Sequence, residues 1–206
     1  MTIPRWEWRC FAPSLTRLAE RAGLPPDAAP HDSDETYILD LDGSGSRIVK
    51  IRDGMLDIKR RLARETDGLE LWLPVLKTPL PLSREDVTAF FGAFLPAASI
   101  RTTYALDALL AEIVAPQTTL RAVPLHKTRR GFVFDDCRAE LTQIRSGSLD
   151  LQTFSLEHED PQRLRAALQR LRLDPGVNSS YETGLKHALG FDEEREPPGA
   201  AGPRGQ

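Results

Sequence analysis

Basic side chains recur at intervals of two residues along this chain. The pairs are Lys50 with Arg52, Lys59 with Arg61, and Lys127 with Arg129, and Arg9 follows Arg5 by four residues. In a β-strand, a spacing of two places both side chains on the same face. Arginine binds phosphate oxygens through paired hydrogen bonds, and lysine adds a compact charge. The spacing therefore predicts strand faces that bind a phosphate-bearing anion.

Carboxylates are interspersed with these bases, and two of them could bind a metal ion. They are Glu7, Asp57, Glu70, Asp136, Glu140, Glu157 and Glu159. Glu157 and Glu159 share one face of the last expected strand, and Mg²⁺ and Mn²⁺ prefer oxygen ligands. A metal that bridges phosphates and polarises phosphorus is a standard arrangement for hydrolysis by water. We therefore expect Mg²⁺ or Mn²⁺ as the cofactor, with Glu157 and Glu159 as its ligands.

Whether these charges repel one another or are solvated depends on whether the strands close into a barrel. In a barrel of eight strands the bases would converge on the lumen and repel one another unless an anion filled it. In an open sheet the same faces would be solvated and would carry surface ion pairs. Alternation alone leaves both arrangements open, because closure has no signature in the period of a strand.

Alternation of apolar and polar residues predicts eight strands. They cover residues 5–11, 35–41, 46–53, 55–62, 69–77, 118–129, 132–144 and 151–159. Gly54 and Gly131 are expected at hairpin turns. Helical patterns cover residues 14–22, 83–94, 105–113, 161–171 and 180–189. The class is α+β with antiparallel strands dominating. Residues 1–192 are expected to form one domain, and the Pro/Gly-rich residues 193–206 a disordered tail.

The composition argues against several classes of function. The formal charge of the 206 residues is −3, so no global basic field attracts nucleic acid or an anionic membrane. Cys10 and Cys137 form no CxxC pair, which argues against a disulfide framework or a structural zinc site. No apolar run reaches the length of a membrane span. We expect a reduced, cytoplasmic protein whose partner is a small anion, and the oligomeric state is left open.

The order of these segments resembles the CYTH superfamily, the triphosphate tunnel metalloenzymes. RIVKIR at 47–52 with LDIK at 56–59 resembles the family's LRIR…LTLK pair, and HKTRR at 126–130 its later K-x-R strand. IRSG at 144–147 with FSLEHEDP at 154–161 resembles the glutamate-bearing closing strand and the helix after it. Residues 173–190 resemble the ending of the inorganic triphosphatase members. The resemblance runs from about residue 5 to residue 190, and it rests on the ordered series of segments.

This resemblance implies an antiparallel eight-stranded β-barrel, or tunnel, with peripheral helices. It also implies a triphosphate-type ligand and a divalent metal. The implied phosphate-binding residues are Arg9, Lys50, Arg52, Lys59, Arg61, Lys127 and Arg129. The implied metal ligands are Glu157 and Glu159, and the catalytic candidates are Glu7 and Glu140.

Two positions depart from the family pattern. The opening strand, usually Glu-x-Glu-x-Lys, reads Arg5-Trp6-Glu7-Trp8-Arg9. Thr142 stands where an Asp is usual before the IRSG-like segment. Both departures remove negative charge from the place where the resemblance puts the metal.

Two functions from different classes fit these residues. The first is a metal-dependent triphosphatase, a phosphoric anhydride hydrolase acting on a triphosphate or polyphosphate. The alternative is a non-catalytic module that binds polyphosphate or a nucleotide, which Arg5 and Thr142 favour. A polyphosphate-polymerising relative is a third reading, since a more basic opening strand would suit it. Arg5 is expected to repel the metal and so to favour tight binding over turnover.

Overall fold

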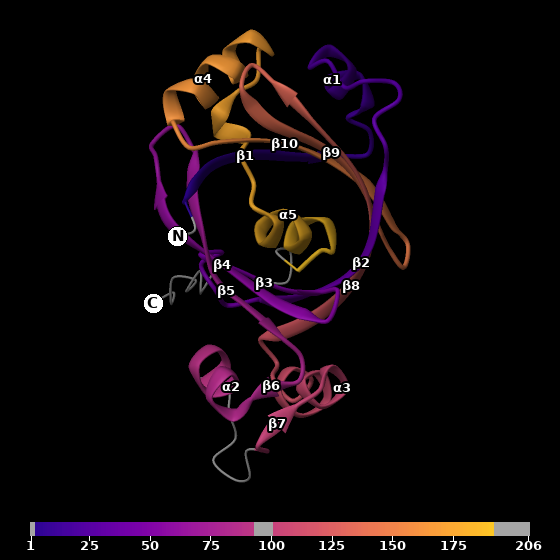
Figure 1. Cartoon of the computed structure of the whole chain (residues 1–206), viewed down its shortest axis with the longest axis vertical. Helices are drawn as coiled ribbons and strands as arrows, with labels where there is room; N and C mark the ends of the chain where they lie inside the picture. Colours follow the sequence, from indigo (N-terminus) through magenta and orange to yellow (C-terminus); the bar gives the residue numbers. More distant parts are fainter. Residues whose placement is uncertain (1–2, 93–100, 192–206) are drawn as a thin grey trace, which may run out of the picture.

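The computed structural model describes residues 3–92 and 101–191. Within these residues, eight strands form a closed antiparallel barrel in the order β1-β10-β9-β8-β2-β3-β4-β5 (Figure 1). The strands are β1 (Arg5–Ala12), β2 (His31–Asp40), β3 (Arg47–Arg52), β4 (Met55–Arg64), β5 (Glu70–Pro79), β8 (Leu120–Phe134), β9 (Cys137–Ser146) and β10 (Leu149–His158). The expected eight-stranded antiparallel barrel is therefore confirmed, and the open sheet is excluded.

One of the two expected hairpin turns is confirmed and the other is wrong. The β3–β4 turn lies at Asp53 and Gly54, whose φ angles of 52° and 68° suit a tight hairpin. Gly131 instead lies inside β8, where it pairs with Glu140 of β9. The chain reverses at Asp135 and Asp136, whose φ angles of 51° and 64° are ones that aspartate tolerates better than most residues. β8 is consequently a single strand of 15 residues.

The helices follow the expected segments with one change of type. They are α1 (Thr16–Arg21), α2 (Arg84–Phe91), α3 (Leu106–Ala108), a π-helix (Leu109–Val114), α4 (Pro161–Arg170), a 3₁₀ turn (Pro175–Val177) and α5 (Tyr181–Ala188). Ser83 forms a capping box with Asp86 at the start of α2. The segment expected as one helix over 105–113 widens into the π-helix, which buries Leu109, Ile113 and Val114 together. Residues 93–94 of the second expected helix and the expected tail at 193–206 lie outside the described residues.

Most of the helices cover the outside of the barrel. α1 and α4 lie over β1, β9 and β10, where Trp8, Phe154 and Leu168 are buried in one apolar cluster. α2, α3, the π-helix and the short strands β6 (Leu82–Ser83) and β7 (Thr103–Tyr104) form a projection on the opposite side (Figure 1). No helix in the described part of the chain is long and apolar enough to cross a membrane.

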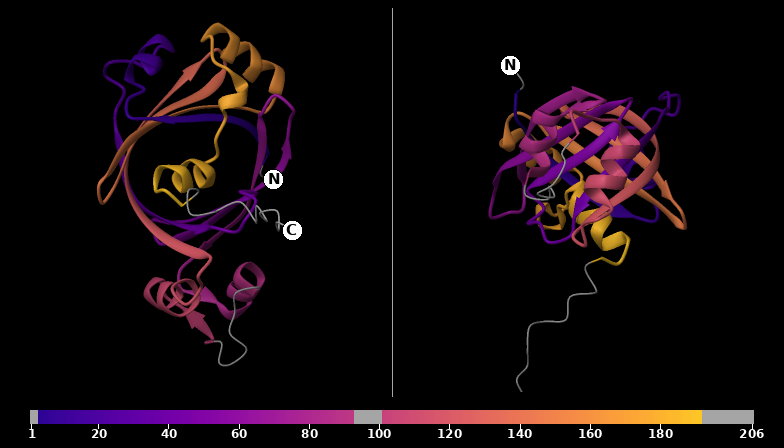
Figure 2. Two further views of the ribbon diagram at one scale, coloured as in Figure 1. Left: turned by 180° about the vertical axis from the view of Figure 1, so that it is seen from behind. Right: turned by 90° about the horizontal axis from the view of Figure 1, so that it is seen from below.

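α5 differs from the other helices because it lies inside the barrel. Its own Tyr181 and Leu185 pack in one apolar cluster against inward-facing side chains of the strands: Tyr37, Leu39, Ile48, Trp72, Val123, Leu125, Ile144 and Leu151. Figures 1 and 2 show this helix within the outline of the barrel in opposite views. A Cβ on Gly184 would lie 2.2 Å from the Phe11 ring, so the helix approaches β1 as closely as a glycine allows. The helix thereby fills one end of the lumen.

Candidate functional site

The inward faces of β8 and β3 change from apolar to charged along their length. On β8, Val123 and Leu125 pack against the cluster around α5, whereas Lys127 and Arg129 line an open cavity. On β3, Ile48 likewise belongs to the apolar cluster, and the next inward residue is Lys50. The cavity has a volume of about 700 Å³ and is the part of the lumen that α5 leaves free.

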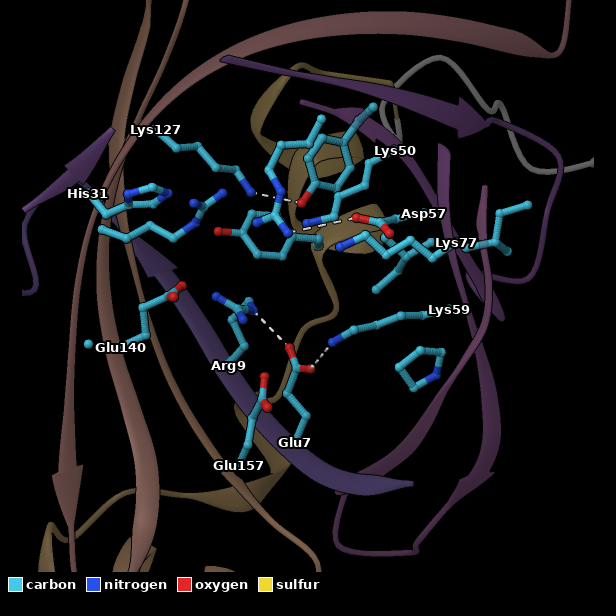
Figure 3. A pocket seen from close by; sticks show the side chains of 18 of the residues that line it. Glu7, Arg9, His31, Lys50, Asp57, Lys59, Lys77, Lys127, Glu140 and Glu157 are labelled. Atoms are coloured by element: carbon cyan, nitrogen blue, oxygen red, sulfur yellow. Dashed lines mark hydrogen bonds and ion pairs between the residues drawn. The ribbon is translucent and has the colours of Figure 1, made fainter. Parts of the chain in front are cut away.

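Charged side chains dominate the cavity wall (Figure 3). Among the described residues, the cationic lining side chains are Arg9, Lys50, Arg52, Lys59, Lys77, Lys127 and Arg129. The carboxylates are Glu7, Asp57, Glu140 and Glu157. The structure therefore brings together every side chain that the sequence nominated for the site except Arg61 and Glu159.

Arg61 and Glu159 lie outside the cavity lining for different reasons. The β4–β5 pairing is unbroken from Lys59 to Arg61, and Arg61 lies opposite Trp72, which belongs to the apolar cluster around α5. Arg61 then pairs with Glu70, with 2.6 Å between Nη1 and Oε1. Glu159 follows the last residue of β10, and its half-exposed carboxylate lies 3.1 Å from the Arg5 guanidinium. A spacing of two therefore places Arg61 on the face of Lys59 but not at the same depth in the barrel, and it does not apply to Glu159, which lies beyond the end of β10.

Glu7 holds two of the lining cations. Its Oε1 accepts a hydrogen bond from Arg9 Nε at 3.0 Å, and Lys59 Nζ lies 3.6 Å from its Oε2. Burial alone would raise the pKa of Glu7, but Lys59 and Arg9 together hold this pKa below its usual value. Arg9 also donates to Thr153 Oγ1 at 3.0 Å and lies 4.2 Å above the Tyr181 ring of α5. Glu7 is thus an ionised counter-charge that orients Arg9 and Lys59.

Glu157 is the carboxylate with the most freedom to bind a ligand. It lies opposite Glu7 in the β1–β10 pairing, and its side chain has no hydrogen bond or ion pair within the described residues. Burial, and then the charge of Glu7, raises the pKa of Glu157. Glu140 lies nearby on β9, where its Oε1 accepts a hydrogen bond from buried Thr142 at 2.8 Å. Thr142 therefore orients Glu140 where the family pattern has an acid.

Glu35 is a buried carboxylate that the sequence analysis did not assign to the site. It lies behind four of the lining cations. It forms ion pairs with Lys50, Arg52, Lys127 and Arg129. The signal was present in the predicted strand over 35–41, since Glu35 shares the parity of the buried Tyr37. Its four partners could not be predicted, because they come from other strands.

Both lysines that pair with Glu35 have a lowered pKa. Burial, and then repulsion from Lys127 and Arg52, lowers the pKa of Lys50 to about 7. Burial also lowers the pKa of Lys127, whose Nζ donates to the Tyr37 hydroxyl at 2.7 Å and lies 3.6 Å from the centre of the Tyr181 ring. These aromatic contacts favour the ammonium form and position it toward the cavity.

Further lining residues had no sequence assignment in this role. His31 and Lys77 lie at the wall of the cavity, and Tyr37 and Tyr181 face it from β2 and α5. Lys77 is the last residue of the strand predicted over 69–77, so its position in the alternation could have assigned it to one face of that strand. Nothing local indicates that Tyr181, on a helix, reaches a lumen formed by strands.

The donor set fits a divalent metal in part. Across residues 3–92 and 101–191, no three side chains of His, Cys, Asp or Glu converge closely enough to hold a metal by themselves. Glu157 nevertheless offers free carboxylate oxygens to the cavity, and Mg²⁺ is commonly bound by one or two carboxylates together with substrate phosphates. The residues therefore fit a metal that arrives with a phosphate ligand, held by Glu157.

The strands close into a barrel, and basic and acidic side chains of the expected segments face one lumen. The chain thus has the closed antiparallel eight-stranded barrel that its resemblance to the CYTH superfamily implies. In this barrel, β1 turns Glu7 and Arg9 into the cavity, whereas Arg5 pairs with Glu159 away from it. The position of Arg5 thus gives no support to repulsion of a metal within the site.

Comparisons with known proteins find similar structures at low identity. No family model and no curated protein matches the chain. A "putative adenylate cyclase" from Bacillus halodurans is 13% identical with a TM-score of 0.48, covering 89% of this chain and 97% of that one. HpAC1 from Hippeastrum, described as having a dominant triphosphatase activity, is 15% identical with a TM-score of 0.46, covering 96% and 98%. A conserved hypothetical protein from Pyrococcus furiosus is 10% identical with a TM-score of 0.46, covering 86% and 98%. Likenesses at this level carry no conclusion about activity.

Proposed function

We propose that the cavity binds a triphosphate or polyphosphate and hydrolyses a phosphoric anhydride bond with Mg²⁺ or Mn²⁺. The supporting observation is the convergence of cationic side chains from β1, β3, β4, β5 and β8 on one cavity that also contains the unpaired carboxylate of Glu157. Buried cations at this density are costly without a compensating anion. A polyanion with several oxygens on each phosphorus suits paired arginine and lysine contacts.

The charge balance of the cavity favours a metal as a companion of the ligand. Among the described lining residues, seven cationic side chains face four carboxylates, and Glu35 behind them reduces the formal surplus to two. Lys50, with its lowered pKa, is only partly charged near neutrality. The negative charge of a triphosphate is larger than this positive surplus. A divalent cation shared by Glu157 and the phosphate oxygens would supply the remainder.

The residues divide into holding and reacting groups. Lys50, Arg52, Lys127 and Arg129 would hold the phosphate chain. Glu140, oriented by Thr142, would accept a proton from water as the water oxygen forms a bond to the terminal phosphorus. The bridging P–O bond breaks at the same centre, and the shortened phosphate chain leaves with the electron pair.

A non-catalytic polyphosphate or nucleotide module is the second candidate. It is favoured by the pairing of Glu7, whose two carboxylate oxygens already face Arg9 and Lys59 and are less available to a metal. In this reading Glu7 orders the binding cations, and the cavity retains its ligand without turnover.

Phosphate release from tripolyphosphate distinguishes the two candidates. We expect release by the wild type with Mg²⁺ or Mn²⁺, no release in excess chelator, and no release by Glu157→Gln with either metal. Calorimetric titration of the same proteins should show that Glu157→Gln still binds tripolyphosphate. Binding by the wild type without release would favour the module. Turnover that survives chelation would remove the metal role, and absence of binding would overturn the proposal.

A further inference from the structure

The Glu35 carboxylate is shared among four cations. Its side chain is 0% exposed. Oε1 faces the two arginines, with Arg129 in contact and Arg52 Nη1 at 3.6 Å. Oε2 faces the two lysines, with Lys127 Nζ at 3.2 Å and Lys50 Nζ at 3.5 Å. Each carboxylate oxygen thus binds one cation from β3 and one from β8.

The strand order explains why one residue reaches all four partners. β2 lies between β3 and β8, and Glu35 is opposite Arg52 on one side and Leu125 on the other. Its side chain therefore points inward between the basic pair of β3 and the basic pair of β8. The four cations line the cavity and Glu35 does not, which places the carboxylate behind them.

One carboxylate orders these cations without neutralising them. Four clustered cations without a shared counter-charge would repel one another and turn toward solvent or any available anion. Glu35 is the carboxylate that all four share in the described part of the chain, and Arg52 also lies 3.6 Å from Asp53 and 3.8 Å from Asp57. The shared charge opposes the repulsion and leaves a formal positive surplus facing the cavity. Ordered donors bind a ligand of matching shape at a lower entropic cost than mobile donors do.

We propose that Glu35 is a positioning residue that holds Lys50, Arg52, Lys127 and Arg129 in the arrangement of a bound phosphate chain and so makes the site selective for triphosphate over small anions. The inference rests on the proposed phosphate site. It assigns selectivity to a residue that does not touch the ligand. The predicted consequence of losing Glu35 is a cavity that still binds anions but distinguishes them poorly.

Glu35→Gln tests this role with Glu70→Gln as its matched control. Glu70 is also buried in the barrel wall and accepts from Arg61 Nη1 at 2.6 Å and from Trp72 Nε1 at 3.2 Å, but it does not line the cavity. Calorimetric dissociation constants are measured for tripolyphosphate and for sulfate, together with the melting temperature. We expect both variants to melt lower than the wild type. Only Glu35→Gln should lower the ratio of the sulfate to the tripolyphosphate constant, by at least about tenfold, because charge-assisted contacts lose their geometry.

The outcomes separate this inference from the proposed function. A wild type that binds tripolyphosphate no better than sulfate overturns the proposed function. A selective wild type whose ratio survives in Glu35→Gln, or falls equally in Glu70→Gln, overturns the role of Glu35 alone. If Glu35→Gln does not fold, Glu35→Asp carries the test, since its shorter carboxylate cannot reach all four cations. An unchanged ratio in Glu35→Asp then overturns the inference, and a lowered ratio supports it.

Discussion

Replacement of Lys50 by methionine should abolish a proton uptake that accompanies triphosphate binding. The Lys50 side chain is 18% exposed, and its Nζ lies 3.5 Å from a carboxylate, Glu35, that three other cations share. Burial and the neighbouring cations therefore prevail over this pairing and lower the pKa of Lys50 to about 7. Roughly nine-tenths of the amine is then neutral at pH 8 in the free protein.

A polyanion bound beside the amine stabilises the ammonium form and raises the pKa toward its ordinary value. The wild type should therefore take up about 0.9 proton per triphosphate bound at pH 8. The sign follows from the lysine: binding is at full strength below pH 7, where the ammonium is already present, and weakens as the pH rises. Between pH 7 and pH 9 this one group should weaken binding by about 50-fold.

Calorimetry at pH 8 in two buffers with different protonation enthalpies measures the uptake directly. The ligand's own titration cancels in the difference between wild type and Lys50→Met. Lys50→Arg is the control, since arginine remains charged throughout this range and should bind without proton uptake. Equal uptake by the wild type and Lys50→Met would refute the assignment of the proton to Lys50.

Three other changes test the cavity, the lumen helix and the surface. Lys127→Met preserves an apolar stem and should weaken tripolyphosphate binding by about tenfold or more, measured by titration, because one charge-assisted contact is lost. Gly184→Ala should lower the free energy of unfolding in urea by about 1–3 kcal/mol, because the new Cβ meets the Phe11 ring. Arg5→Gln should change phosphate release by less than about threefold, because the exposed Arg5–Glu159 pair lies outside the cavity.

A different result would contradict each of these three predictions. Circular dichroism must show that Lys127→Met is folded, and unchanged affinity in the folded variant would exclude Lys127 from the site. Gly131→Ala is the control for the lumen helix, since a Cβ at Gly131 would have no atom within 4 Å beyond its immediate neighbours in the described part of the chain. If Gly131→Ala and Gly184→Ala lost equal stability, the close approach of α5 to β1 would not be the cause. A large loss of turnover in Arg5→Gln would place Arg5 in the reaction after all.

Local alternation was sufficient to predict the strands and most of the lumen-facing charges. Lys50 with Arg52 and Lys127 with Arg129 line one cavity because each pair lies in an unbroken strand. Parity could not place Glu159, which follows the last residue of β10, nor could it show that Arg61 lies beside Trp72 and beyond the cavity. Gly131 was misread as a turn because a glycine in a strand and a glycine in a hairpin look alike in sequence. Parity is a local rule, and it holds only as far as the pleat continues.

Closure, the position of α5 and the role of Glu35 were decided by the tertiary structure. An amphipathic helix has the same residue pattern whether it packs on the outside of a barrel or inside it, so residues 180–189 could be predicted as a helix but not located. Glu35 acquires its partners from 15 to 94 residues away, through the register of β2 with β3 and β8. The sequence by itself determined which side chains carry charge and which strand face they share. Only the folded barrel decided which of them meet, because electrostatic pairing depends on distances between strands that no local pattern records.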